Sequence, residues 1–199
     1  MQFSLICNIK KFMQNNTALI NRIFPTEGTS TYLRNIILVI FGTLLLTVSA
    51  KVQVPFWPVP MTMQTFVVFL IGMTYGWRLA LFTLLAYLFE GALGLPVFAK
   101  GGGLAYLIGP TAGYLYGMFF ASIVIGMLSQ KGFSNSYALC LIALIIGSII
   151  IFALGVGYLG SIIGYDKAIT AGLMPFIPSE LFKIALAVAI IPSLSKNFK

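Results

Sequence analysis

Long apolar segments dominate the chain, and short polar segments separate them. A bilayer core of about 30 Å requires roughly 20 consecutive apolar residues in a helix. The apolar runs are continuous rather than alternating in short segments, which argues against a transmembrane β-barrel. We therefore predict an all-α integral membrane protein with six transmembrane helices in one bundle. The predicted spans are residues 34–50, 62–76, 79–94, 111–128, 137–163 and 175–192.

Composition supports this class and limits the number of domains. Apolar residues make up 59% of the chain and charged residues 8%, with a mean hydropathy of +1.01. Soluble domains carry about 25% charged residues. The 199 residues allow one bundle and no second domain of comparable size. We expect a cytoplasmic tail over residues 1–33, either an amphipathic helix on the membrane surface or a disordered leader, and a substrate-binding domain of six helices over residues 34–199.

The positions of the basic residues predict the orientation. Lysine and arginine accumulate on the cytoplasmic side of membrane proteins. With the N-terminus inside, eight basic residues lie in the cytoplasm and three lie outside. We therefore expect both termini inside a multi-pass protein of the cell membrane. The outer connections are then residues 51–61, 95–110 and 164–174, which are rich in proline, glycine and aromatic residues.

Several classes of function lack the residues they need. The chain contains no histidine, and Cys7 and Cys140 have no metal-ligand spacing. Its basic residues are scattered rather than clustered, so nucleic acid is not an expected partner. No Walker A sequence occurs, and no nucleophile with a base is evident. We expect no metal, no cofactor and no enzymatic activity.

The connection at residues 95–110 contains three consecutive glycines. Glycine tolerates positive φ and lets the main chain approach another group closely. The preceding Pro96, Val97 and Phe98 offer an apolar wall. The combination is typical of a lid that closes over a small molecule, although a connecting loop rich in glycine would look the same.

A second outer segment, residues 51–65, is held extended by prolines. Its aromatic residues suit either a belt at the membrane interface or a second flap over the same cavity. Thr62 and Gln64 would offer hydrogen bonds at the rim of that cavity.

Two charged side chains lie at the start of the last span. Glu180 and Lys183 are three residues apart and therefore share one face of a helix. An ionised side chain within a span costs about 2.5–3.5 kcal/mol on insertion scales, so it usually faces the bundle interior with a partner. Either the two residues simply neutralise each other, or Lys183 binds a ligand carboxylate while Glu180 accepts hydrogen bonds or orients the lysine.

Three further side chains lie at the same level. Glu90 is a rim residue, a partner of a lysine, or protonated. Tyr87 and Tyr114 either contact a ligand or lie at the membrane interface. The candidate ligand-binding residues are therefore Thr62, Gln64, Tyr87, Glu90, Pro96, Val97, Phe98, Gly101, Gly102, Gly103, Tyr114, Glu180 and Lys183.

The first span carries a face of small residues. Thr43 and Thr47 are four residues apart, with Gly42 alongside, and such a face lets another helix pack closely. The neighbour is either a helix of this chain or a different subunit.

Four separated motifs together resemble the BioY family. They are "PVPMTMQT", "GLPVFAKGGG", "GPTAGYLYG" and "PFIPSELFK", in the family's order and spacing, and the match extends from about residue 34 to the end. BioY proteins are the biotin-binding S components of energy-coupling factor (ECF) transporters. The resemblance implies six helices that hold one biotin near the outer face, and a contact of Thr43 and Thr47 with a transmembrane T component that works with two ATPases.

The chain departs from the family pattern at three positions. Relatives usually have Gly-Asp where this chain has Ser179-Glu180, a small residue at Lys100 and an apolar residue at Glu90. The expected function is capture of biotin from outside for ATP-driven import by separate T and ATPase subunits. The alternatives are a solitary biotin carrier or facilitator and an S component for another small vitamin.

Overall fold

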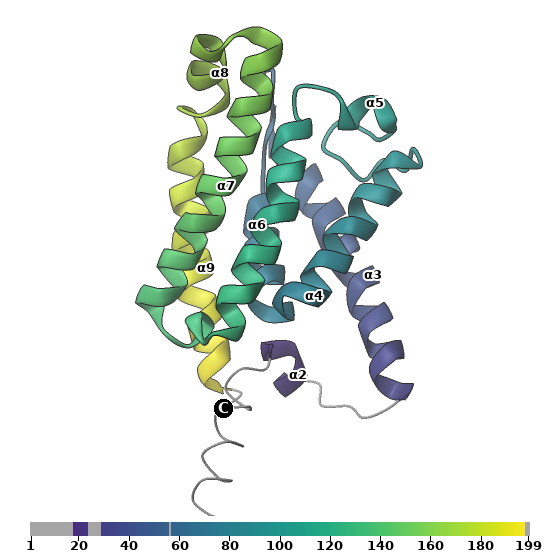
Figure 1. Ribbon diagram of the computed structural model, residues 1–199, viewed down its shortest axis with the longest axis vertical. Helices are drawn as coiled ribbons and strands as arrows, with labels where there is room; N and C mark the ends of the chain where they lie inside the picture. The colour runs from purple at the N-terminus through teal and green to yellow at the C-terminus, as the bar shows by residue number, and fades with distance from the viewer. Residues whose placement is uncertain (1–17, 24–28, 56, 198–199) are drawn as a thin grey trace, which may run out of the picture.

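The computed structural model describes residues 18–23, 29–55 and 57–197, and the described chain is mostly helical (Figure 1). Five helices in it are long and apolar enough to cross a membrane, so the all-α membrane class is confirmed. In chain order the elements are α2 (Leu19–Ile23), α3 (Thr29–Lys51), β1 (Gln53–Val54), β2 (Met61–Thr62), α4 (Gln64–Ala92), α5 (Leu104–Leu107), α6 (Ala112–Gln130), the 3₁₀ turn η1 (Phe133–Asn135), α7 (Tyr137–Ile163), α8 (Tyr165–Gly172) and α9 (Phe176–Asn197).

The predicted spans fall on these helices, but most of the predicted tail lies outside the described residues. The first span begins earlier than predicted, with α3 at Thr29, and the last continues through α9 to Asn197. Of the tail over residues 1–33, the structure describes only α2, its flanking Ala18 and the start of α3. The amphipathic helix considered for the remainder lies outside the described residues.

The second and third predicted spans form one element, α4, which reverses direction at Gly76. This residue has φ 74° and ψ 169° inside the element, a conformation that is essentially restricted to glycine. The reversal brings the two halves side by side, because the Gln64 side chain at one end donates a 2.7 Å hydrogen bond to the Tyr87 hydroxyl near the other. The tight turn expected between these spans is therefore a single glycine conformation.

Small residues on α6 allow it to lie against α7. Gly113 and Gly117 are four residues apart and both face α7. A Cβ atom on Gly117 would lie 2.8 Å from the Cα of Ile151, a distance that real Cβ atoms essentially never show. Stripes of small residues let membrane helices approach closely. Because of this close contact, α6 and α7 both line the same cavity, which is described below.

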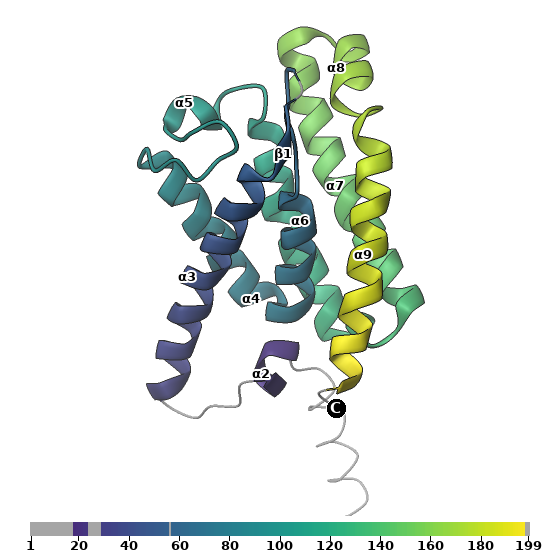
Figure 2. The same ribbon diagram turned by 180° about the vertical axis from the view of Figure 1, so that it is seen from behind.

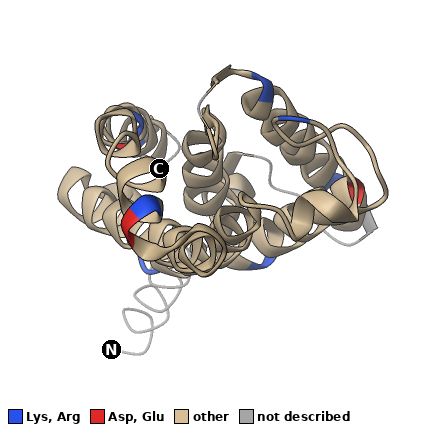
Figure 3. Ribbon diagram, turned by 90° about the horizontal axis from the view of Figure 1, so that it is seen from above, with Lys and Arg blue, Asp and Glu red and all other residues tan. Residues whose placement is uncertain are grey.

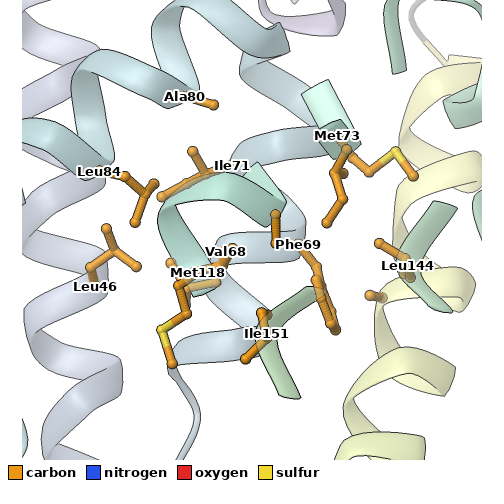
Figure 4. Packing of buried hydrophobic residues seen from close by; sticks show 14 of the residues in the cluster. Leu46, Val68, Phe69, Ile71, Met73, Ala80, Leu84, Met118, Leu144 and Ile151 are labelled. Carbon is orange, nitrogen blue, oxygen red and sulfur yellow. The ribbon is translucent and has the colours of Figure 1, made fainter. Parts of the chain in front are cut away.

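The core lies between α3, both halves of α4, α6, α7 and α9. Figure 4 shows Leu46 of α3 beside Leu84 of α4, and Met118 of α6 near Ile151 of α7. All four side chains are buried. Large apolar side chains on the outside of the bundle remain exposed, as expected for helices that face lipid.

The three connections predicted at the outer face lie together at one end of the molecule. The β1–β2 hairpin, the segment with α5, and α8 gather there, whereas the turn of α4 and η1 lie at the other end (Figures 1 and 2). Charged residues occupy few positions along the described helices (Figure 3). Which end faces the cytoplasm stays a prediction based on the basic residues.

The small-residue face of α3 is used partly inside this chain. A Cβ atom on Gly42 would lie 2.5 Å from Thr83 of α4, and Thr43 is 3% exposed. The Thr43 and Thr47 hydroxyls donate to carbonyl oxygens of their own helix, and Thr47 is half-buried. Internal packing therefore accounts for Gly42 and Thr43, and a contact with a second subunit stays a prediction.

The reversal at Gly76 predicts a large effect of a small substitution. Gly76→Ala would impose a backbone conformation that costs a residue with a side chain about 1–3 kcal/mol. The added Cβ atom would also lie 2.8 Å from the Gln130 amide nitrogen. We expect a lower free energy of unfolding, measured by denaturation of the purified protein in detergent.

The matched control is Gly157→Ala in α7, where an added Cβ atom meets nothing within 4 Å. Alanine is favoured over glycine in a helix by up to about 1 kcal/mol, so this variant should be at least as stable as the wild type. Equal stability of Gly76→Ala and Gly157→Ala would contradict the role assigned to Gly76.

Candidate ligand-binding site

A cavity lies at the end of the molecule that carries the hairpin, α5 and α8. It encloses about 40 Å³, far less than the roughly 300–1,000 Å³ of a typical small-molecule pocket. Side chains from every membrane-length helix except α3 contribute to it. The β1–β2 hairpin and the connection at residues 95–110, which we call the glycine segment, also contribute. It is lined by Val59, Pro60, Thr62, Gln64, Thr65, Phe98, Ala99, Tyr106, Thr111, Tyr114, Leu115, Met118, Ile151, Phe152, Phe176, Glu180 and Lys183.

A buried ion pair forms the charged part of the cavity wall. The Lys183 ammonium lies 3.0 Å from Glu180 Oε2, and the two residues are 3% and 4% exposed. Their spacing of three residues on α9 places both on the same face of the helix, as the sequence predicted. Between residues that the structure describes, this is the one ion pair. The arrangement satisfies the expectation that charges within a membrane bundle face inward and have a partner.

Two hydroxyl groups from other helices complete the ion pair. The Thr65 hydroxyl in α4 accepts a 2.9 Å hydrogen bond from Lys183 and donates a 2.8 Å bond to Glu180 Oε2. The Ser148 hydroxyl in α7 donates to Glu180 Oε1 at 3.1 Å. A buried ion pair is tolerated only when further hydrogen bonds satisfy its remaining polar atoms. The cluster therefore ties α9 to α4 and α7 beside the cavity.

The cluster is neutral as a whole, yet it retains hydrogen-bonding capacity. An ammonium group has three N–H donors, and these contacts use two of them. Each carboxylate oxygen of Glu180 can accept more than one hydrogen bond. The site can therefore offer both a donor and acceptors to a polar ligand group without a net charge.

The glycine segment forms a tight turn that directs Phe98 and Ala99 to the cavity. Phe98 and Gly101 pair through two backbone hydrogen bonds, of 2.9 and 3.3 Å. Gly101 and Gly103 have φ of 131° and 100°, and a Cβ atom on Gly102 would overlap the carbonyl of Leu95. The glycines thus shape the turn rather than line the cavity.

Side chains at the end of α3 and in β1 hold this turn in place. The Lys51 ammonium donates a 2.6 Å hydrogen bond to the Phe98 carbonyl oxygen. The Gln53 amide donates a 3.1 Å bond to the Ala99 carbonyl oxygen. The two outer segments that the sequence predicted as a lid and a flap are therefore joined directly.

Tyr87 does not line the cavity, but it contacts Gln64 and Phe98, which do. Its hydroxyl accepts a hydrogen bond from Gln64 and donates a 2.9 Å bond to the Val97 carbonyl oxygen. Its ring meets Phe98 edge-on at 5.3 Å, and Phe98 in turn stacks on Tyr106 at 4.9 Å. Tyr87 therefore joins α4 to the glycine segment and fixes the aromatic wall.

The structure divides the predicted site residues into two groups. The cavity is lined by Thr62, Gln64, Phe98, Tyr114, Glu180 and Lys183. The predicted residues that do not line it are Tyr87, Glu90, Pro96, Val97, Gly101, Gly102 and Gly103. Glu90 is half-buried and Pro96 is exposed. The role of every residue in either group toward a ligand stays a prediction.

Sequence reasoning missed several residues that shape the site. Thr65 follows Gln64 directly, and Ser148 is a polar residue in the middle of a very apolar helix. A polar residue within a span usually faces the bundle interior, which would have been a signal for both. The contact of Lys51 with Phe98 joins residues 47 positions apart and has no local signal.

Comparisons with known proteins give one consistent result. The model of the BioY family matches residues 15–199. A probable biotin transporter BioY of Rickettsia prowazekii is 34% identical over 181 residues, covering 90% of this chain and 92% of that protein. The biotin transporter BioY of Thermotoga maritima is 40% identical over 156 residues, covering 77% and 91%.

A solved structure is similar to this protein over most of the length of both chains. It is the crystal structure of the S component for biotin from an ECF-type ABC transporter. The two chains superpose with a TM-score of 0.75 and 25% sequence identity, over 86% of this chain and 95% of that one. The arrangement of helices described above is therefore shared with that protein.

The two hydrogen bonds of Tyr87 predict a stability effect. Tyr87→Phe would leave the Gln64 amide and the Val97 carbonyl without this partner in a buried place. Buried polar groups without partners cost about 1–3 kcal/mol, so we expect the free energy of unfolding in detergent to fall by roughly that amount. The control is Tyr116→Phe, whose exposed hydroxyl donates to the Leu107 carbonyl oxygen. A comparable loss in both variants would show that the Tyr87 contacts have no special role.

Proposed function

The chain belongs to the BioY family, and we propose that it captures biotin in the described cavity as the substrate-binding subunit of a membrane transporter. The observation that carries the proposal is the buried cluster of Glu180, Lys183 and Thr65 beside an aromatic cavity. The family match and the names of the relatives support biotin as the ligand. The protein is multi-pass, and we propose the cell membrane as its location.

Biotin has a neutral ureido head whose chemistry matches the cluster. The head presents two N–H donors and one carbonyl acceptor. Glu180 offers acceptors, and Lys183 has an N–H donor beyond the two in use. A bound polar group left without partners would cost about 1–3 kcal/mol, so this match favours the ureido head over a purely apolar ligand.

The ligand carboxylate fits less well at Lys183. Glu180 already lies 3.0 Å from the ammonium, so a ligand carboxylate there would place two negative charges against one positive charge in a buried site. We therefore replace the carboxylate contact expected from the sequence with a ureido contact. The carboxylate then lies toward the mouth, where exposed Lys100 follows Ala99 of the cavity wall.

The apolar part of biotin would lie against aromatic side chains. Phe98 and Tyr106 form one wall, and Phe176 stacks on Tyr114 at 6.3 Å on the other side. Small-molecule sites combine such walls with few polar groups that fix orientation. This division of labour suits a ligand with a bicyclic apolar body and one polar head.

Binding requires the cavity to widen. Its volume of about 40 Å³ is too small for a bicyclic ligand. The hydrogen bonds from Lys51 and Gln53 to the glycine segment close the cavity at the hairpin side. We propose that this segment and the hairpin separate for entry and close again over biotin.

Energy for transport would come from other subunits. The similar solved structure is an S component from an ECF-type ABC transporter. We propose that this chain likewise works with a transmembrane T component and two ATPase subunits, and that it is not itself an enzyme. The alternative is a solitary carrier, and the uptake test below distinguishes it from a subunit that needs partners.

Removing the Lys183 ammonium should weaken biotin binding. We expect Lys183→Ala to raise the dissociation constant at least tenfold, because loss of one charge-assisted contact costs about 1.4 kcal/mol. The measurement is titration of purified protein with labelled biotin at nanomolar concentration. Lys167→Ala, which removes an exposed lysine on α8, should bind as the wild type does. Since Lys183→Ala leaves Glu180 unpaired, the double variant Glu180→Gln with Lys183→Ala keeps the site neutral if the single variant does not fold.

Biotin amide distinguishes the two orientations in the same titration. If the ureido head meets Lys183, the amide should bind wild-type protein nearly as well as biotin does, and Lys183→Ala should weaken both ligands equally. If the amide binds poorly to wild-type protein and Lys183→Ala binds both ligands alike, the carboxylate is the partner of Lys183. Absence of saturable biotin binding to the wild type would mean a different ligand.

Uptake by cells tests the need for partner subunits. Cells that make this chain without a T component or ATPases should bind biotin yet accumulate none above background. Accumulation should appear when a T component and both ATPases are made together with it. Undiminished uptake by the chain alone would establish a solitary carrier and leave the binding site unaffected.

A further inference from the structure

A groove on the lipid-facing side of the bundle shares part of its wall with the ligand cavity. It runs between α7 and α9, beside α8, and measures about 710 Å³. Ile149 of α7 and Leu181 of α9 line it and are each 61% exposed, as expected for membrane helices that face lipid. Among the described residues, Phe152 and Glu180 line both spaces. We call this hollow the α7–α9 groove, and Glu180 is the charged residue in the wall between it and the cavity.

Packing alone does not hold the Glu180 carboxylate in place. The α7–α9 groove offers far more room than the cavity, which encloses about 40 Å³. Apart from Ser148, Glu180 and the Tyr165 hydroxyl, the described lining of the groove has no polar side chain. Hydrogen bonds therefore determine where the carboxylate lies, and on the groove side Ser148 provides the bond.

The two oxygens of the Glu180 carboxylate are held from different sides. Oε2 accepts hydrogen bonds from Lys183 at 3.0 Å and from Thr65 at 2.8 Å, and both of these residues line the cavity. Oε1 accepts a 3.1 Å bond from Ser148, which lines the α7–α9 groove but not the cavity. The last torsion angle of a glutamate side chain has broad energy wells. Contacts at Oε2 alone would therefore let Oε1 turn, and the bond from Ser148 fixes the plane of the carboxylate.

We propose that Ser148 is a positioning residue for ligand binding, which acts from outside the cavity by fixing the plane of the Glu180 carboxylate. The inference rests on the proposed binding of the biotin ureido head at Glu180. An sp² oxygen accepts hydrogen bonds best near its own plane, so a turned carboxylate would meet the ureido N–H poorly. The residues that α7 contributes to the cavity lining itself, Ile151 and Phe152, are apolar. Through Ser148, α7 also acts on the polar head of the ligand.

Biotin titration of purified full-length variants tests the inference. Ser148→Ala should raise the dissociation constant about tenfold, the effect of losing one charge-assisted contact. Ser148→Thr keeps a hydroxyl at this position, and the α7–α9 groove has room for the added methyl group, so binding should return close to the wild-type value. The matched control is Ser122→Ala, which removes a buried α6 hydroxyl that donates to the Phe119 carbonyl oxygen and should bind as the wild type does. Ser148→Cys, which keeps only a weak donor, replaces Ser148→Ala if that variant does not fold.

Infrared spectra of the biotin-free protein give a second measurement that does not depend on the ligand. The stretching frequency of a carboxylate changes when one of its oxygens loses a hydrogen bond. The chain has only 4 acidic residues, so the carboxylate bands are few, and Glu180→Gln identifies the band of Glu180 by its loss. This band should shift in Ser148→Ala and keep its wild-type frequency in Ser148→Thr and Ser122→Ala.

The outcomes separate this inference from the proposed function. If the wild type binds biotin, then unchanged affinity of Ser148→Ala, a loss that Ser148→Thr does not restore, or an equal loss in Ser122→Ala would each overturn the role of Ser148 alone. An unshifted Glu180 band in Ser148→Ala would overturn it as well. Absence of saturable biotin binding to the wild type would contradict the proposed function, and the role of Ser148 in binding with it.

Discussion

The ion pair between Glu180 and Lys183 is the interaction on which the site depends. Two charges inside a membrane bundle are stable only if each satisfies the other and further hydrogen bonds satisfy the rest. Thr65 and Ser148 supply those bonds from α4 and α7. The requirement therefore fixes the relative positions of three helices at the level of the cavity. It also sets the chemistry offered to a ligand, which is hydrogen bonding without net charge.

The second constraint is the close approach of helix backbones, which glycine residues allow. It positions the helices that surround the ion pair. Gly117 brings α6 against α7, and Gly76 folds α4 back so that Gln64 meets Tyr87. Tyr87 then holds the carbonyl of Val97, which positions the aromatic wall at Phe98. A chain of contacts thus runs from a turn at one end of the molecule to the cavity at the other.

The two ends of the bundle differ in how they use charge. At the cavity end, opposite charges are buried together and cancel, so a neutral polar head is favoured. At the other end, Arg34 and Arg78 line an open groove between α3 and the second half of α4. The chain has only 12 basic and 4 acidic residues. Because charged residues are so few, the place of each one in the bundle is informative.

The sequence by itself determined the membrane class, the helical spans, the position of the Gly76 turn and the shared face of Glu180 and Lys183. These are local properties, set by hydropathy and by the helical repeat. Only the tertiary structure decided that the glycines of the lid segment shape a turn while Phe98 and Ala99 reach the cavity. It alone paired Thr65 with Glu180, 115 positions away, and Lys51 with Phe98. Such pairs depend on how helices pack, and no local pattern of residues encodes which side chains then meet.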